Sequence, residues 1–172
     1  MKKLLMLSFV FVMFIGGQGL HANAADLKNG SAFSFKFADP KGYFTNGAQI
    51  TAHKNVFENA FSKMNNVSSK IKLIRNGSSP AIRTRSQDTK QEWYGLWDGG
   101  RYAGTISLNK YTTTRDKFTS ANYNKTALHE LGHALGLKHQ SASSASLMKS
   151  GKYAYNDYTT LDKNNLKYQY GK

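Results

Sequence analysis

Apolar residues recur at helical spacing in two long stretches of the chain. Between residues 45 or 46 and 64 they fall at positions 50, 56, 57, 60, 61 and 64, which predicts an amphipathic helix. A second helix is predicted over residues 125–135, with Asn122 or Asn124 as its N-cap. Shorter apolar runs predict strands at residues 33–37, 71–74 and 81–85, and Asn76-Gly77 and residues 98–100 predict turns.

The start of the chain has the pattern of a secretory signal peptide. Lys2 and Lys3 precede an apolar run over residues 4–15, and Ala22 and Ala24 provide a small-x-small cleavage site. The run is shorter than the roughly 20 residues that span a bilayer, which disfavours the alternative of a retained membrane anchor. We therefore expect residues 1–24 to be removed, leaving residues 25–172 as one secreted domain.

Charge and cysteine content narrow the class of protein. The net charge is +14, and loss of Lys2 and Lys3 with the leader leaves +12. The basic residues are scattered, and no nucleic-acid recognition motif accompanies them, so we expect no nucleic acid but a weak association with anionic cell surfaces. The chain has no cysteine, which excludes disulfides and inhibition by a cysteine propeptide.

Three of the five histidines lie within eleven residues, together with one of the three glutamates. His129 and His133 are four residues apart, so on a helix both imidazoles project from one face. Glu130 lies about 100° round the helix, close enough to reach a water on a metal but poorly placed to bind the metal itself.

His139 is too far along the chain to join them on the same helix. Gly136 is the residue that can end the helix and turn the chain back, because glycine adopts a left-handed backbone without a Cβ penalty. Three imidazoles then leave one tetrahedral position open, which is typical of a catalytic zinc site. The alternative, an amphipathic helix with satisfied histidines, does not explain a third histidine after a helix-ending glycine.

This motif, His-Glu-x-x-His-x-x-Gly-x-x-His, resembles the zinc-binding consensus of the metzincin metalloproteases at every fixed position. The segment around Met148 resembles their Met-turn, with Met148 beneath the metal, and residues 158–171 resemble the last helix of the matrixins. The resemblance implies an α+β zincin-like metzincin domain. Its parts would be a twisted mixed sheet, two long helices and a small C-terminal subdomain ending in a third helix.

The resemblance also implies further roles. The segment before the zinc helix resembles the edge strand of bacterial matrixin-like peptidases, which pairs with substrate; its residues are Gly104, Thr105, Ile106, Ser107 and Leu108. Asp162 matches a helix aspartate that braces the Met-turn, although it could equally cap or solubilise its helix.

Several residues depart from the family pattern. Matrixins usually have serine after the third histidine, where this chain has Gln140, and no tyrosine follows Met148 by two residues. The His-x-Asp pattern of a second, structural zinc is missing before residues 104–108. We therefore expect one catalytic zinc. A calcium site at Asp98 would have a single carboxylate in its favour, so calcium lacks support.

Together these residues predict a monomeric, secreted zinc endopeptidase acting on proteins or peptides. A zinc held by neutral histidines lowers the pKa of bound water towards about 7, and Glu130 would act as general base. Two alternatives stay open: a zinc-binding surface-adhesion domain with little catalysis, and a metal-dependent hydrolase of non-protein substrates.

Overall fold

The computed structural model describes residues 25–77 and 79–171, so the predicted leader lies outside the described residues. Ten helices and strands follow one another in this part of the chain. In order they are η1 (Asn29–Ala32), β1 (Tyr43–Asn46), α1 (Thr51–Asn65), β2 (Ile74–Arg75), β3 (Ile82–Gln87), β4 (Gly95–Gly99), β5 (Gly104–Asn109), α2 (Lys110–Arg115), α3 (Ser120–Ala134) and α4 (Thr160–Tyr170).

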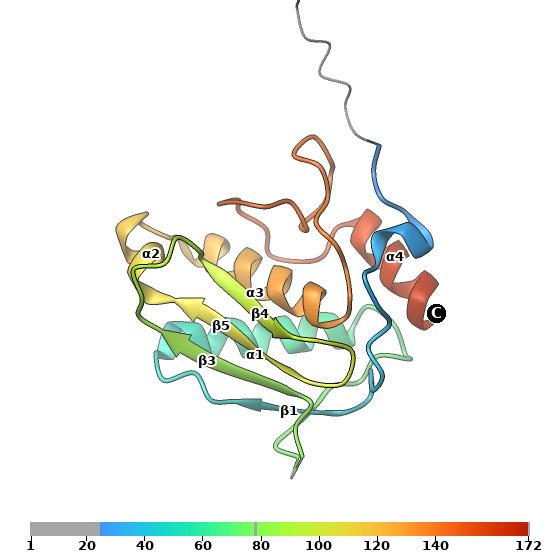
Figure 1. Cartoon of the computed structure of the whole chain (residues 1–172), viewed down its shortest axis with the longest axis horizontal. Coiled ribbons are helices and arrows are strands. Elements are labelled where there is room, and N and C mark those ends of the chain that lie inside the picture. Colours follow the sequence, from blue (N-terminus) through green and yellow to red (C-terminus); the bar gives the residue numbers. More distant parts are fainter. Residues whose placement is uncertain (1–24, 78, 172) are drawn as a thin grey trace, which may run out of the picture.

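The strands form one mixed sheet in the order β2-β1-β3-β5-β4 (Figure 1). The first four in this order run parallel, and β4 alone is antiparallel to its neighbour β5. In β3, Ile82 and Thr84 are buried while Arg83 and Arg85 are exposed. This alternation is expected of a strand with one face on the core and one on solvent.

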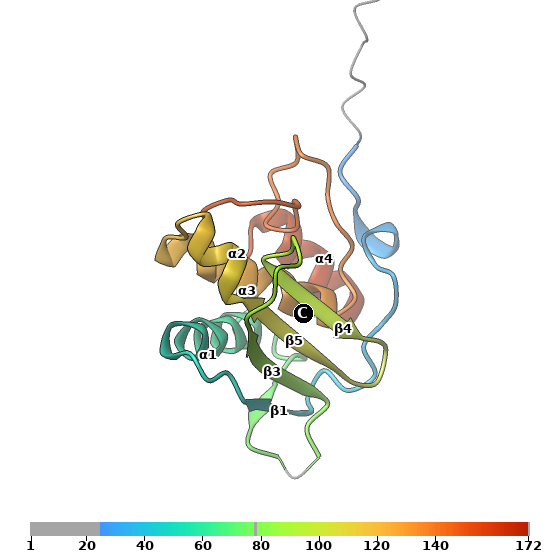
Figure 2. The same cartoon turned by 60° about the vertical axis from the view of Figure 1, so that its left-hand side comes forward.

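The two long helices, α1 and α3, lie side by side on one face of the sheet (Figures 1 and 2). Their inward-facing apolar residues meet those of the strands; Phe61 of α1, for example, stacks on Phe44 of β1 with ring centroids 3.6 Å apart. The centre of this core is fully buried and includes Phe57, Met64, Ile82, Ile106, Leu108, Leu128 and Leu131. The zinc motif thus lies on a helix held rigidly against the sheet.

The helix starts are fixed by side-chain caps. The α3 helix begins after Thr119, whose hydroxyl accepts from the Asn122 N–H while the Asn122 side chain accepts from the Thr119 N–H. The α4 helix has the same reciprocal arrangement between Thr159 and Asp162. The predicted N-caps Asn122 and Asn124 are therefore wrong, and α3 starts earlier than expected.

The edge strand is also not where we expected it. Residues 104–108 do form a strand, but β5 is hydrogen-bonded to β3 on one side and to β4 on the other. Its backbone is already paired, and its last four residues are buried. The expectation that Gly104, Thr105, Ile106, Ser107 and Leu108 form the edge is wrong, because the chain adds the antiparallel strand β4 outside them.

Other predicted elements fare unevenly. The strand at 81–85 is confirmed as β3 and the turn at Asn76 has a positive φ, but the run at 71–74 yields only the two-residue β2. The helix predicted to begin at residue 45 or 46 begins instead at Thr51, because residues 45 and 46 belong to β1. Residues 33–37 form no strand; Phe33 makes only an isolated bridge to Leu137.

The N-terminal segment runs beside α4 and the segment that follows α3 (Figure 1). Ser34 donates its N–H to the Gly136 carbonyl, and Lys138 donates its N–H to the Ala32 carbonyl, both at 2.8 Å. This contact joins the start of the domain to its C-terminal part. None of the helices in the described residues is long and apolar enough to cross a bilayer.

Candidate metal centre and active site

The three histidines of the motif converge on one point. The Nε2 atom of His129 lies 3.1 Å from Nε2 of His133 and 3.1 Å from Nε2 of His139. One possible ligand atom from each of the three residues lies within 4.8 Å of the other two. In the described part of the chain this is the one such cluster of histidine, cysteine or carboxylate groups. The sequence prediction that these residues share a site agrees with their placement.

The geometry and the hydrogen bonds suit zinc. With Zn–N distances of about 2.0–2.1 Å, nitrogens of a tetrahedral site lie about 3.3 Å apart, close to the 3.1 Å found here. Nδ1 of His133 lies 2.7 Å from the Leu137 carbonyl, and Nδ1 of His129 lies 3.2 Å from the Leu147 carbonyl. A carbonyl only accepts, so each Nδ1 carries the proton and each Nε2 lone pair faces the cluster.

Burial keeps these imidazoles in the form that binds metal. It lowers the pKa of His133 to about 4, and it lowers the pKa of His129 well below its ordinary value. The pKa of His139 is lowered for the same reason, and the positive charge of Lys125 acts in the same direction on all three. Neutral histidine is the metal-binding form, so the site is ready at neutral pH without loss of a proton.

His139 reaches the cluster because the chain reverses at Gly136. This residue has φ +89°, and a Cβ there would lie 2.1 Å from the Phe35 carbonyl oxygen. Both the backbone angle and the space require glycine. The returning segment is then held by Gln140, whose side chain accepts from the Leu27 N–H and donates to the Leu27 carbonyl, each at 2.8 Å.

Met148 packs against α3 next to the cluster. This residue is 1% exposed, and a Cβ on Gly132 would lie 2.6 Å from its sulfur, so the methionine lies directly against the zinc helix. Asp162 accepts hydrogen bonds from the Ser146 hydroxyl and from the Leu147 N–H just before it, and also caps α4 through Thr159. Asp162 therefore both braces the segment before Met148 and caps α4, as the two expectations for it had it.

Glu130 lies between the histidines and β4. Burial raises the pKa of its carboxyl to about 7, while the backbone N–H of Trp97 and the charge of Lys125 lower it. A Cβ on Gly95 would lie 2.7 Å from Cγ and 2.8 Å from Oε1 of Glu130. The absence of a side chain at position 95 is what lets the edge strand approach the carboxylate so closely.

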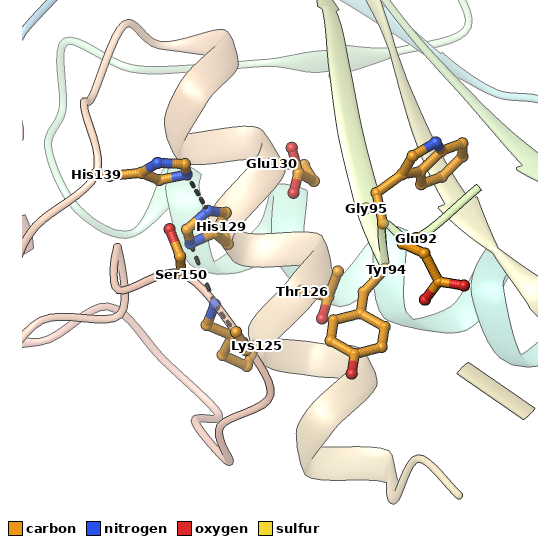
Figure 3. A pocket seen from close by; sticks show the side chains of 11 residues that line it. Glu92, Tyr94, Gly95, Lys125, Thr126, His129, Glu130, His139 and Ser150 are labelled. Carbon is orange, nitrogen blue, oxygen red and sulfur yellow. Dashed lines mark hydrogen bonds between the residues drawn. The ribbon is translucent and has the colours of Figure 1, made fainter. Parts of the chain in front are cut away.

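Two cavities flank the cluster. The smaller, of about 240 Å³, lies between α3, the loop that leads into β4 and the loop at 150–151, and Lys125 is among its lining residues (Figure 3). The larger, of about 330 Å³, lies on the side of His133 and is lined by Phe35, Leu96 and Trp97. Glu130 and His139 line both cavities, so the two lie on either side of these residues.

Sequence reasoning missed Gly95, Trp97 and the role of Lys125. A hairpin signal was present, since two runs flank the glycines at 99 and 100, but β4 shows no apolar alternation that marks it as a strand. Lys125 stood out only as a helix residue. A buried lysine cannot be told from an exposed one by its position next to a motif.

Comparison with known proteins agrees with this site. The family model described as Matrixin matches residues 97–170, which contain the histidine cluster, Met148 and α4. A solved structure of myroilysin superimposes with a TM-score of 0.57 and 13% identity, covering 82% of this chain and 98% of that one. A search of curated proteins finds no match.

Fold and site thus define an α+β zincin-like domain with a three-histidine cluster that fits a metal. Within that class the chain is similar to the matrixins over residues 97–170, and its fold is that of a matrixin-like metalloprotease. The similarity to matrixins implies a catalytic zinc, and the histidine cluster is where the ion would bind.

Proposed function

We propose that residues 25–172 form a secreted zinc endopeptidase that hydrolyses protein or peptide substrates, with Glu130 as general base. The observation that carries the proposal is the buried carboxylate of Glu130 beside three neutral imidazoles whose Nε2 atoms face one point. This combination suits the activation of water for attack on a peptide carbonyl. The predicted signal peptide supports secretion.

His129, His133 and His139 would hold the zinc, which when bound supplies Lewis acidity that makes water a nucleophile near neutral pH. Glu130 takes the proton from the attacking water and later gives it to the leaving amine. Its raised pKa suits both steps, because a carboxyl near pKa 7 exchanges protons readily at neutral pH. The hydrogen bond from the Trp97 N–H and the charge of Lys125 favour the ionised carboxylate, which is the form that accepts a proton.

The substrate would lie along β4 instead of residues 104–108. The outer edge of β4 pairs with no other described strand, and β4 lines the larger cavity beside Glu130. An extended peptide can add to such an edge by main-chain hydrogen bonds, and its side chains then enter the flanking cavities. Leu96 and Trp97 would form one wall of the larger cavity.

The test compares the wild-type protein with Glu130→Ala and a control, Glu58→Ala. Glu58 is a half-exposed residue of α1 whose side chain pairs with Arg75 and accepts from Asn46, outside the histidine cluster and its cavities. We expect all three proteins to bind one zinc per chain and only Glu130→Ala to lose cleavage of unfolded casein, by about a thousandfold, in line with loss of a general base.

The outcomes separate the candidate functions. Full zinc content with no cleavage by the wild type would favour the alternative of a surface-adhesion domain, for which the net charge of +14 is the supporting feature. Comparable casein cleavage by Glu130→Ala would show that the assigned base is wrong. Absence of bound zinc from all three proteins would overturn the metal site itself.

A further inference from the structure

One buried cation next to the cluster lacks an anionic partner. Lys125 is 3% exposed, and its Nζ donates to the Lys149 carbonyl at 2.6 Å and to the Gly151 carbonyl at 3.1 Å. All ion pairs of the described residues involve other side chains. Buried lysines are rare unless a carboxylate compensates them, so this ammonium is an unusual feature of the site.

The ammonium also has a hydrogen-bond donor to spare. Its third close neighbour is Nδ1 of His129, at 3.3 Å, but the same nitrogen lies 3.2 Å from the Leu147 carbonyl. An Nδ1 that donates its proton to Leu147 cannot also accept from Lys125. With two N–H groups used by carbonyls, the third has no oxygen or nitrogen acceptor among the described residues in this tautomer; the Tyr153 ring centroid lies 5.9 Å from Nζ.

Lys125 and Glu130 both line the smaller cavity, but they lie on different sides of it. Figure 3 shows Lys125 on the side of Ser150, whereas Glu130 lies on the side of Gly95 and β4. The other acid of this cavity, Glu92, is already neutralised, because both of its carboxylate oxygens accept from Arg115 at 2.8 and 2.7 Å. The cavity therefore offers a positive charge that forms no ion pair with a described residue, although Glu130 stabilises it at longer range.

We propose that Lys125 makes this cavity selective for a carboxylate side chain, so that the enzyme prefers substrates with glutamate or aspartate next to the scissile bond. The proposal rests on the proposed peptidase function and adds its substrate class. A substrate carboxylate would pair with the buried Lys125 ammonium and accept a hydrogen bond from its third N–H. The result would be a charge-assisted hydrogen bond to a buried cation.

The first test needs no variant. A peptide library locates the cleaved bond and the flanking position with the strongest acidic preference. Three matched peptides then carry glutamate, glutamine or leucine at that position. Glutamine has nearly the shape of glutamate, so the ratio of the two kcat/KM values isolates the charge. We expect glutamate to be favoured over glutamine by about tenfold or more, as a hydrogen bond to a charged group contributes.

The second test removes the charge. Lys125→Met keeps the length of the side chain, and we expect its glutamate-to-glutamine ratio to fall to about one. Lys125→Arg keeps the charge and should retain the preference. Lys149→Met is the matched control: it removes a positive charge close to Lys125 but in the loop after α3, where Lys149 lies 4.6 Å from the Tyr153 ring and outside the cavity lining. Its ratio should stay that of the wild type.

The results distinguish this inference from the proposed function. Cleavage of all three peptides at equal rates would leave a peptidase and overturn the role of Lys125. An equal fall of the ratio in Lys149→Met would assign the preference to the overall positive charge instead. If Lys125→Met does not fold, a wild-type preference for leucine or glutamine would still refute the proposal. Failure of the wild type to cut any peptide would overturn both.

Discussion

At the scale of single residues, the approach of β4 to Glu130, the proposed general base, depends on one missing side chain. Gly95 faces Glu130, and a Cβ there would lie 2.7 Å from both Glu130 Cγ and Thr126 Cγ2. Contacts this short force a displacement, and either the carboxylate or the strand must move. Since catalytic groups tolerate little displacement, position 95 should control activity without touching the metal.

We predict that Gly95→Ala lowers kcat/KM on a peptide substrate by about a hundredfold, the size of effect that a displacement of about 1 Å produces. Zinc content should stay at the wild-type level, because the histidines do not contact Gly95 in the cluster geometry. Gly100→Ala is the control, since a Cβ at position 100 meets nothing within 4 Å. Wild-type rates in Gly95→Ala would show that Glu130 has more room than the structure gives it.

His53 is a buried histidine remote from the cluster. It is 1% exposed, its Nδ1 lies 3.1 Å from the Ser86 hydroxyl, and burial lowers its pKa to about 4. In the unfolded chain its pKa is near 6.5, so between these values the unfolded state binds more protons. The stabilisation from neutral His53 is therefore complete above pH 6.5 and is lost as the pH falls towards 4.

We predict that acidification from pH 7 to pH 4 removes at most about 3 kcal/mol of unfolding free energy through His53. Urea unfolding of the wild type and of His53→Gln at several pH values measures it, because the other titrating groups cancel in the difference. The wild type should lose more stability than the variant between pH 6.5 and 4. Parallel curves for the two proteins would mean that His53 is protonated equally in both states.

At the scale of elements, the sequence predicts best where local physics and burial agree. The zinc helix α3 carries apolar residues at helical spacing, and Gly136 ends its turn with φ +89°, so its position and its end could both be expected. Its start could not, because Thr119 and Asn122 compete as caps and the choice depends on the chain before them.

The edge strand shows what local patterns cannot determine. The β5 strand has apolar residues at alternate positions, Ile106 and Leu108, whereas β4 is mostly exposed and rich in glycine, so it carries little strand signal of its own. Which strand lies at the edge is a property of pairing between distant segments. The resemblance located a strand before the zinc helix but assigned the substrate to the wrong member of the hairpin.

The hydrogen bonds that hold the segment after His139 likewise join residues distant in the sequence. Gln140 holds Leu27 through two hydrogen bonds, and Asn165 of α4 donates to the Leu27 carbonyl at 3.1 Å. Gln140 was noted only as a departure from the family pattern. Its partner lies 113 residues away in the chain, and no pattern along the sequence records such a contact.

At the scale of the whole molecule, the metal site joins two parts of the fold. His129 and His133 belong to α3, which packs on the sheet, while His139 follows the reversal at Gly136 and is tied to the N-terminal segment and α4. The chain has no cysteine and hence no disulfide that could hold these parts together. A bound ion would therefore act as a cross-link between them.

We predict that removal of zinc by a chelator lowers the melting temperature by about 10 °C, because an ion present at a thousand times its Kd stabilises the native state by about 4 kcal/mol. Differential scanning calorimetry with and without chelator measures the shift, and re-addition of zinc should restore it. The matched variant His139→Ala keeps the two helix ligands but breaks the link between the parts, so its melting temperature should respond little to the chelator. An equal response of wild type and variant would place the stabilisation on α3 alone, and no response in either would remove the ion from the stability of the fold.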